Sequence, residues 1–258
     1  LFRSKVPFIA DLYDNFEGFG QARIPGMKHL LRQAVCQAQL VTTTSQPLAE
    51  LVIHDYATQA KVVSLPSTVD LTTFRSGNKS NARERFGLLP NKQYIGTAGG
   101  LYKDKGVEVI YQAWEKLKHE MPNVHLVLAG PYQPDYPPPE EERVHYLGSL
   151  AHHEISTLFQ ALDLGIISIL DTPFGRYCFP QKAYEMLACD LPVVVANIGE
   201  MSYLFRDSPQ VLFQTGNAND LASKIQQQLQ SPQQQSIAVE DWATIIQRIE
   251  PMITALKF

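Results

Sequence analysis

Short apolar runs alternate with amphipathic stretches along almost the whole chain of 258 residues. The apolar runs predict buried strands, and the stretches with helical spacing predict helices. Such alternation favours parallel sheets covered by helices on both faces, so the expected fold class is α/β with Rossmann-like sheets. The predicted strands are Val6–Ala10, Gln39–Thr43, Lys61–Leu65, Gln93–Ala98, Val124–Ala129, Val144–Leu147, Leu164–Ile169, Pro192–Ala196 and Val211–Phe213. The predicted helices are Met27–Ala38, Pro47–Tyr56, Gly106–His119, His153–Ala161, Pro180–Cys189, Ala218–Leu229 and Val239–Ala255.

The composition excludes several function classes. With 45% apolar and 19% charged residues, the chain has the balance of an ordinary globular protein, and its net charge of −4 argues against non-specific nucleic-acid binding. The apolar stretch Leu164–Leu170 is far shorter than the roughly 18 residues of a transmembrane segment. The odd set Cys36, Cys178 and Cys189 favours a reducing compartment. We therefore expect a cytoplasmic location, with peripheral attachment to the inner face of the membrane left open.

The stretch from Tyr94 to Gly106 combines an apolar strand, a glycine turn and the start of a helix. It reads Tyr-Ile-Gly-Thr-Ala-Gly-Gly-Leu-Tyr-Lys-Asp-Lys-Gly, with Gly99 and Gly100 in the turn and Lys103 and Lys105 just before the helix. A helix N-terminus with nearby cations suits a phosphate, because free N–H groups and positive charge meet there. The alternative is that both lysines are solvated turn residues.

A second stretch, residues 177–200, predicts a mostly buried helix that carries one carboxylate. It reads Tyr-Cys-Phe-Pro-Gln-Lys-Ala-Tyr-Glu-Met-Leu-Ala-Cys-Asp-Leu-Pro-Val-Val-Val-Ala-Asn-Ile-Gly-Glu. Glu185 lies about a turn and a half into this helix, and Lys182 shares its face three residues earlier. A lone carboxylate among apolar neighbours needs a purpose. The alternative is a surface ion pair between the two residues.

Polar connectors divide the chain. Residues 65–80 form a turn-rich stretch that we interpret as a domain hinge, and residues 131–142 predict a proline-rich surface loop. The predicted division is residues 1–75, 76–238 and 239–258. Leu1 is not a methionine and a strand is predicted almost at once, so we expect the chain to begin inside its first domain.

Taken in order, these motifs resemble the retaining GT-B glycosyltransferases of the family 4 type, the glycosyl transferases group 1. The segment from Val41 to Ala49 is similar to the last strand–helix unit of that family's N-terminal domain. Residues 65–74 are similar to the crossover between the family's two domains, and Asp241-Trp242 is similar to its terminal segment. The resemblance implies a GT-B fold whose N-terminal domain is incomplete here and whose missing part holds much of the acceptor site. It also implies an enzyme of hexosyltransferase type. Such an enzyme moves a sugar from a nucleotide-diphosphate donor, such as a UDP- or GDP-sugar, to an unknown acceptor with retention; a polysaccharide or glycolipid is expected.

The resemblance also assigns roles to single residues. Lys105 matches the family's phosphate-binding lysine, and Glu185 matches the glutamate that accepts hydrogen bonds from the ribose; these two are the candidate catalytic residues. No Asp-x-Asp motif occurs. We therefore expect transfer without a metal or a cofactor, with cations and helix N-termini stabilising the leaving diphosphate. The other candidates for donor binding are Lys103, Gly99, Gly100, Gly175, Arg176, Lys182 and Gly199.

The chain departs from the family pattern at three positions. Gly100 stands where many members have a second phosphate-binding arginine, and Lys103 or Arg176 is a candidate to supply that charge. Tyr177 replaces the first glutamate of the family's Glu-x7-Glu motif, which contacts the donor sugar, although Pro180-Gln181-Lys182 is similar to a Pro-x-Lys variant. Asp190 replaces the usual glycine at the helix end, in a left-handed conformation that aspartate tolerates.

Other functions remain as alternatives. The departures at Gly100 and Tyr177 suit a catalytically weak nucleotide-sugar-binding domain, and a GT-B sugar-nucleotide epimerase is a further candidate. The glycine turn lacks the Gly-x-Gly-x-x-Gly spacing of a dinucleotide fold. His152-His153-Glu154 lacks the spacing of a zinc helix. Cys178 has no obvious base partner and is interpreted as a small half-buried residue.

Overall fold

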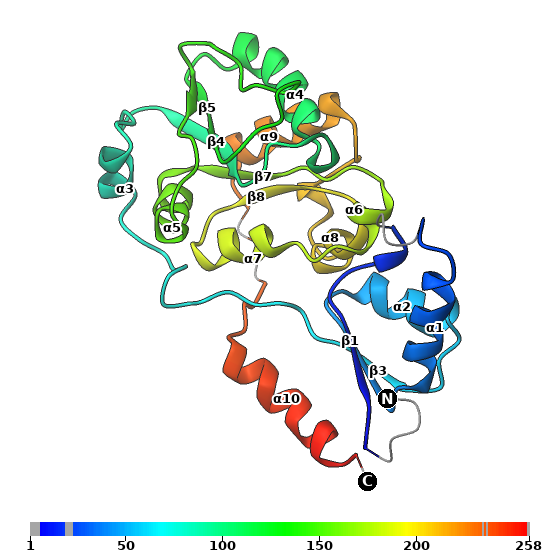
Figure 1. Cartoon of the computed structure of the whole chain (residues 1–258). Helices are drawn as coiled ribbons and strands as arrows, with labels where there is room; N and C mark the ends of the chain where they lie inside the picture. The colour runs from blue at the N-terminus through cyan, green and yellow to red at the C-terminus, as the bar shows by residue number, and fades with distance from the viewer. Residues whose placement is uncertain (1–5, 19–22, 234, 236, 257–258) are drawn as a thin grey trace.

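The computed structural model describes residues 6–18, 23–233, 235 and 237–256, and arranges them around two parallel sheets (Figure 1). The smaller sheet has the order β1-β2-β3 and lies with its helices in the N-terminal unit, residues 6–64. Its apolar strand residues and the inner faces of the two helices form a separate small core. The elements of this unit are β1 (Ile9–Leu12), η1 (Phe16–Gly18), α1 (Met27–Gln37), β2 (Leu40–Thr43), α2 (Gln46–His54) and β3 (Lys61–Ser64).

The larger sheet has six parallel strands in the order β6-β5-β4-β7-β8-β9. In Figure 1 its strands run between α4 and α9, which pack together, and the group of α3, α5 and α7. The strands are β4 (Gln93–Ala98), β5 (Val124–Ala129), β6 (Val144–Tyr146), β7 (Leu164–Ile167), β8 (Val193–Ala196) and β9 (Leu212–Phe213). The helices are α3 (Lys79–Arg85), η3 (Lys103–Lys105), α4 (Val107–Glu120), α5 (His152–Ala161), α6 (Pro173–Tyr177), α7 (Gln181–Ala188), α8 (Gly199–Leu204), η4 (Pro209–Val211), α9 (Ala218–Gln230) and α10 (Trp242–Thr254).

The strand order determines where a ligand can bind. From β4 the chain adds β5 and β6 on one side, and it then returns to add β7, β8 and β9 on the other side. The loops after β4 and β7 therefore leave the sheet toward opposite faces, and a crevice opens between them at the carboxyl ends of the strands. Large apolar side chains such as Trp114, Phe159 and Phe213 are almost fully buried around this sheet and hold the crevice rigidly.

The α/β prediction is confirmed, and each of the nine predicted strands is present with shifted ends at most. The first strand shows the largest shift, since it lies at Ile9–Leu12 rather than Val6–Ala10. Ser45 caps α2: its hydroxyl oxygen accepts a hydrogen bond from the Leu48 N–H at 3.3 Å. Asp190 adopts the expected left-handed conformation, with φ +57°.

Three short α-helices in the described part of the chain, α3, α6 and α8, were not predicted. The stretch interpreted as a polar hinge up to residue 80 contains the start of α3, because the Asn78 side chain accepts from the Asn81 N–H at 3.0 Å and caps the helix. Thr172 caps α6 in the same way, with Pro173 in the first turn. The third, α8, begins at Gly199, shortly after the end of β8.

Candidate functional site

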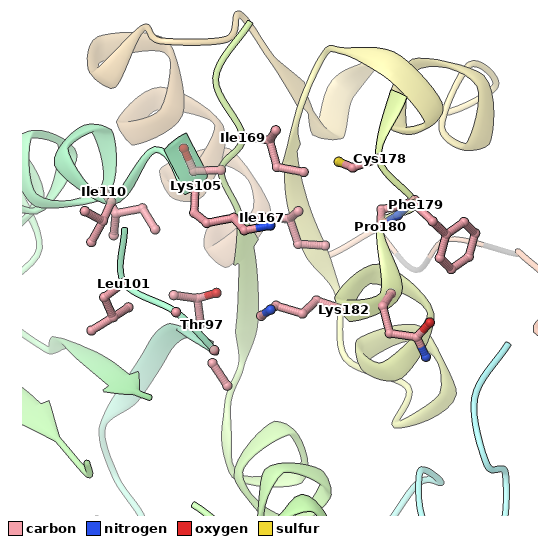
Figure 2. Close-up of a pocket in the computed structure, with 16 residues that line it drawn as sticks. Thr97, Leu101, Lys105, Ile110, Ile167, Ile169, Cys178, Phe179, Pro180 and Lys182 are labelled. Atoms are coloured by element: carbon pink, nitrogen blue, oxygen red, sulfur yellow. The ribbon is translucent and has the colours of Figure 1, made fainter. Parts of the chain in front are cut away.

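A pocket opens at the carboxyl ends of β4 and β7, at the crevice that the strand order predicts (Figure 2). Its walls come from the glycine turn after β4, from the first turns of α4 and α7, and from the residues that follow β7. The lining residues are Thr97, Ala98, Gly99, Gly100, Leu101, Lys105, Val107, Ile110, Ile167, Ser168, Ile169, Cys178, Phe179, Pro180, Gln181 and Lys182.

Lys105 reaches the pocket from the end of η3, directly before Gly106. Gly106 has φ +67° and turns the chain into α4, so the lysine stands at the N-terminus of a long helix. Its ammonium nitrogen lies 3.8 Å from the centre of the Phe174 ring. Within the described part of the chain, no carboxylate lies within ion-pair distance of this ammonium group.

Lys182 enters the same pocket from the first turn of α7. Its ammonium group lies against the backbone of Gly99, where an added Cβ would come within 2.4 Å of the Lys182 Nζ and Cε atoms. Gly99 has φ +111°, so both its conformation and its missing side chain make room for the lysine. Burial lowers the pKa of Lys182; the charge of Glu185 opposes this shift and the charge of Lys105 adds to it.

Figure 2 shows the two ammonium groups reaching into one space, from opposite sides of the pocket. Among the described residues no carboxylate lies within ion-pair distance of either group, and the lining residues include no acid. Two partly buried cations next to two helix N-termini favour an anion with several oxygen atoms. A diphosphate fits this requirement.

Glu185 lies one turn beyond Lys182 on α7 but is not a lining residue of the pocket. Its carboxyl group is partly buried, and burial raises its pKa, whereas the charges of Lys182 and His152 and a hydrogen bond from Gln181 oppose the rise. The structure therefore places Glu185 beside the lysine pocket. The ribose role stays a prediction.

The other predicted donor-binding residues fall into two groups. Gly99 and Gly100 line the pocket as expected. Lys103 is exposed and does not line it, and its backbone N–H donates to the Gln133 side chain at 2.9 Å. Arg176 forms an ion pair with Asp171 and lines a separate groove, so the structure gives neither Lys103 nor Arg176 the place of the missing arginine.

Gly175 and Gly199 join α6 to α8 rather than lining the lysine pocket. The Gly175 N–H donates to the Thr172 hydroxyl at 3.1 Å, as part of the cap of α6. Gly199 has φ +53°, and a Cβ there would lie 2.7 Å from the carbonyl oxygen of Arg176 and 2.8 Å from that of Gly175. Close approach of the two helices therefore requires glycine at position 199.

Tyr177 packs against the small core of the N-terminal unit. Its carbonyl oxygen accepts a hydrogen bond from the Ser45 hydroxyl at 2.8 Å. The position that matches the family's first glutamate is thus used to join the two sheets. Cys178 is fully buried rather than half-buried, and burial raises the pKa of its thiol to about 11, which makes it a poor nucleophile.

A set of interactions that we call the α2–α8 clasp also joins the two sheets. The first backbone N–H of α2, at Gln46, donates to Glu200 Oε2 at 2.6 Å. The Tyr203 hydroxyl contacts both carboxylate oxygens of Glu50, at 2.8 and 2.7 Å. Burial raises the pKa of Glu200 to about 7; the hydrogen bond from Gln46 opposes the rise and the charge of Glu50 adds to it.

Because the pKa of Glu200 is higher in the folded chain than the ordinary value of 4.5, its contribution to stability is fully present below pH 4.5 and is lost as the pH rises toward 7. The difference between the two pKa values of Glu200 corresponds to roughly 3 kcal/mol of folding stability. We expect Glu200→Gln to raise the melting temperature at pH 8 and to leave it nearly unchanged at pH 4.5. Melting curves across this range test this. Glu84→Gln, an exposed change on α3, is the control. A stability difference that is independent of pH would contradict the burial of this carboxyl group.

Fold and pocket together define an α/β protein of the GT-B type. A family model described as glycosyl transferases group 1 matches residues 92–231, more than half of the chain. The chain belongs to this family. Two curated relatives are D-inositol 3-phosphate glycosyltransferases. That of Mycobacterium marinum is 27% identical over 202 residues, 73% of this chain and 41% of the relative. That of Mycobacterium tuberculosis is 27% identical over 189 residues, 68% of this chain and 38% of the relative.

Solved structures share the fold. HepE of Anabaena in complex with UDP has a TM-score of 0.78 at 23% identity, and covers 97% of this chain and 72% of that protein. Sucrose-phosphate synthase of Thermosynechococcus elongatus has a TM-score of 0.76 at 18% identity, over 98% of this chain and 68% of that protein. The chain thus spans about two fifths of the length of the curated relatives and about 70% of these structures. Within the described ranges, no helix is long and apolar enough to cross a bilayer.

Proposed function

We propose that this chain carries the donor site of a glycosyltransferase that takes a sugar from a nucleoside diphosphate, with a UDP-sugar as the first candidate. The observation that carries the proposal is the pair of lysines, Lys105 and Lys182, which meet in one pocket without an acidic partner among the described residues. HepE, which shares the fold, is described in complexes with UDP and with UDP-glucose.

The proposed chemistry follows from the charge that develops during the reaction. When the bond between the sugar and the diphosphate breaks, negative charge grows on the leaving phosphate oxygens. Lys105, Lys182 and the N-terminus of α4 would meet that charge without a metal ion. The absence of an Asp-x-Asp motif from the sequence supports this part of the proposal. The acceptor is proposed to be a carbohydrate or glycolipid hydroxyl, with retention at the transferred carbon.

Calorimetry with UDP, GDP and ADP in the presence of a chelator tests the donor site. We expect at least one of the three to bind, because the lysines already supply the positive charge. Binding that requires magnesium or manganese would overturn the metal-independent site. The configuration of the transferred sugar in the product, read by NMR, tests retention.

A catalytically weak binding domain is the second candidate, and the position of Tyr177 favours it. Its contact with the small core leaves the α6–α7 segment without a carboxylate in the pocket lining. Turnover of a UDP-sugar with release of UDP separates the two candidates. A bound donor that is never consumed in the presence of candidate acceptors would support the weak binding domain.

A further inference from the structure

The N-terminal unit places a carboxylate, that of Asp14, near the lysine pocket. β1 ends at Leu12, and the carboxyl end of a parallel strand faces the crevice in folds of this kind. Tyr13 and Asp14 follow directly. The Thr44 hydroxyl donates to the Tyr13 carbonyl oxygen at 2.8 Å, so this loop is fixed to the end of β2.

The loop after β1 packs against α6, whose Phe174 contacts Lys105. A Cβ added at Gly18 in η1 would lie 3.0 Å from the Pro173 Cβ, at the start of α6. Phe174 is the next residue of α6, and the Lys105 ammonium nitrogen lies 3.8 Å from the centre of its ring. Asp14 therefore lies in the same corner as Lys105 and Cys178, both of which line the pocket: the charge of Lys105 acts to lower the pKa of Asp14, and the charge of Asp14 acts to raise the pKa of the Cys178 thiol.

One oxygen of the Asp14 carboxylate accepts a hydrogen bond within the protein, and the other is available to a ligand. Its Oδ1 atom accepts a hydrogen bond from the Asn15 N–H at 2.8 Å. Within the described residues, Oδ2 accepts none and no cation lies within ion-pair distance. Burial raises its pKa, and the Asn15 hydrogen bond and Lys105 oppose the rise. Since no buried side-chain oxygen of the described residues lacks a partner, Oδ2 is accessible and free to accept a hydrogen bond from water or from a ligand.

The charges decide which part of a nucleotide sugar can donate a hydrogen bond to the Asp14 carboxylate. A carboxylate repels the diphosphate, whereas sugar hydroxyls donate hydrogen bonds to carboxylates. The pocket lining itself contains no acid that could receive them. On the basis of the proposed function, we infer that Asp14 receives a hydrogen bond from a hydroxyl of the donor sugar bound between the two sheets. It would thus contribute to sugar specificity from the opposite wall.

Asp14→Asn tests this inference, because the amide keeps the size of the side chain and its acceptor for Asn15. The dissociation constants of UDP, UDP-glucose, UDP-galactose and UDP-N-acetylglucosamine are measured with a chelator present. We expect Asp14→Asn to bind UDP equally well or up to about threefold tighter, since a negative charge near Lys105 is lost. The advantage of the best UDP-sugar over UDP should fall by about fivefold or more.

Two further variants make the test decisive. Asp104→Asn removes a charge from the exposed side of η3, and it should leave the advantage of the sugar unchanged. Asp14→Ser keeps a hydroxyl acceptor for Asn15 and replaces Asp14→Asn if that variant does not fold. An unchanged sugar advantage in the Asp14 variants, or no advantage in the parent chain, would overturn the inference. Failure of the parent chain to bind UDP, GDP or ADP would instead contradict the proposed function.

Discussion

Replacing both pocket lysines should abolish measurable nucleotide binding by this chain. Lys105→Met and Lys182→Met each remove a charge-assisted hydrogen bond to the diphosphate, which contributes about 1.5–3 kcal/mol. Each single variant should therefore bind UDP about 10- to 100-fold more weakly, and the double variant should fall below detection. Calorimetry at two salt concentrations measures the loss, and the salt dependence of binding should be smaller in each single variant.

The same substitutions should not destabilise the unliganded protein. The two ammonium groups lie in one pocket, and burial and the charge of Lys105 lower the pKa of Lys182, so the charged form of Lys182 carries an electrostatic cost in the absence of an anion. We expect Lys182→Met to raise the melting temperature while it weakens UDP binding. If Lys182 instead stabilised the fold, Lys182→Met would lower the melting temperature, and UDP binding would weaken because less of the protein is folded.

Lys103→Met is the matched control for the lysine variants. Lys103 lies two residues from Lys105, carries the same charge and is exposed outside the pocket lining. We expect its replacement to change UDP affinity by less than threefold, as for an exposed charge screened by water and salt. A loss as large as that of Lys105→Met would show that the general charge of η3, rather than the geometry of the pocket, binds the nucleotide.

Local sequence patterns predicted most of the fold because each strand and long helix carries its own periodicity. Two of the short helices were missed because one capping side chain decides each of them: Asn78 begins α3, and Thr172 begins α6. Nothing in a run of polar residues distinguishes a cap from an ordinary turn residue.

The lysine pocket could be anticipated in part because Gly99 and Lys105 are close in the sequence, and because Lys182 begins a helix with a clear apolar pattern. The second cation was harder to assign. Lys103 and Arg176 were the candidates for the charge missing at Gly100, but the structure brings Lys182 to Gly99 instead. That contact joins residues 83 positions apart and depends on how α7 sits against the turn after β4.

Contacts between the units of the two sheets could not be predicted from any local sequence pattern. Asp14 follows a strand of the small sheet, and its relation to Lys105 exists only because η1 packs on α6. Tyr177 matches the position of a family glutamate, yet it packs against the small core, because α6 lies next to α2. The relative placement of two sheets is set by many weak contacts that no single motif encodes.

Glu185→Ala should weaken the binding of nucleoside diphosphates by about 1.5–3 kcal/mol, the range for hydrogen bonds to a charged group. The carboxyl group is partly buried beside Lys182, where an uncompensated charge is costly. Hydroxyl groups of a bound ribose would compensate that cost. The loss should therefore appear in nucleotide binding and not in the melting temperature of the unliganded chain.

A comparison of ligands separates a ribose contact from a general effect on the pocket. The parent chain should bind UDP more tightly than 2′,3′-dideoxy-UDP. Glu185→Ala should remove most of that difference, because removing the carboxylate and removing the ribose hydroxyls eliminate the same hydrogen bonds. Inorganic pyrophosphate has no ribose, so its affinity should stay unchanged or rise slightly as a negative charge near Lys182 is lost. A folded Glu185→Ala variant that still distinguishes UDP from its dideoxy analogue as strongly as the parent would show that the ribose lies elsewhere. In that case the role of Glu185 would be limited to holding Lys182 in its charged form.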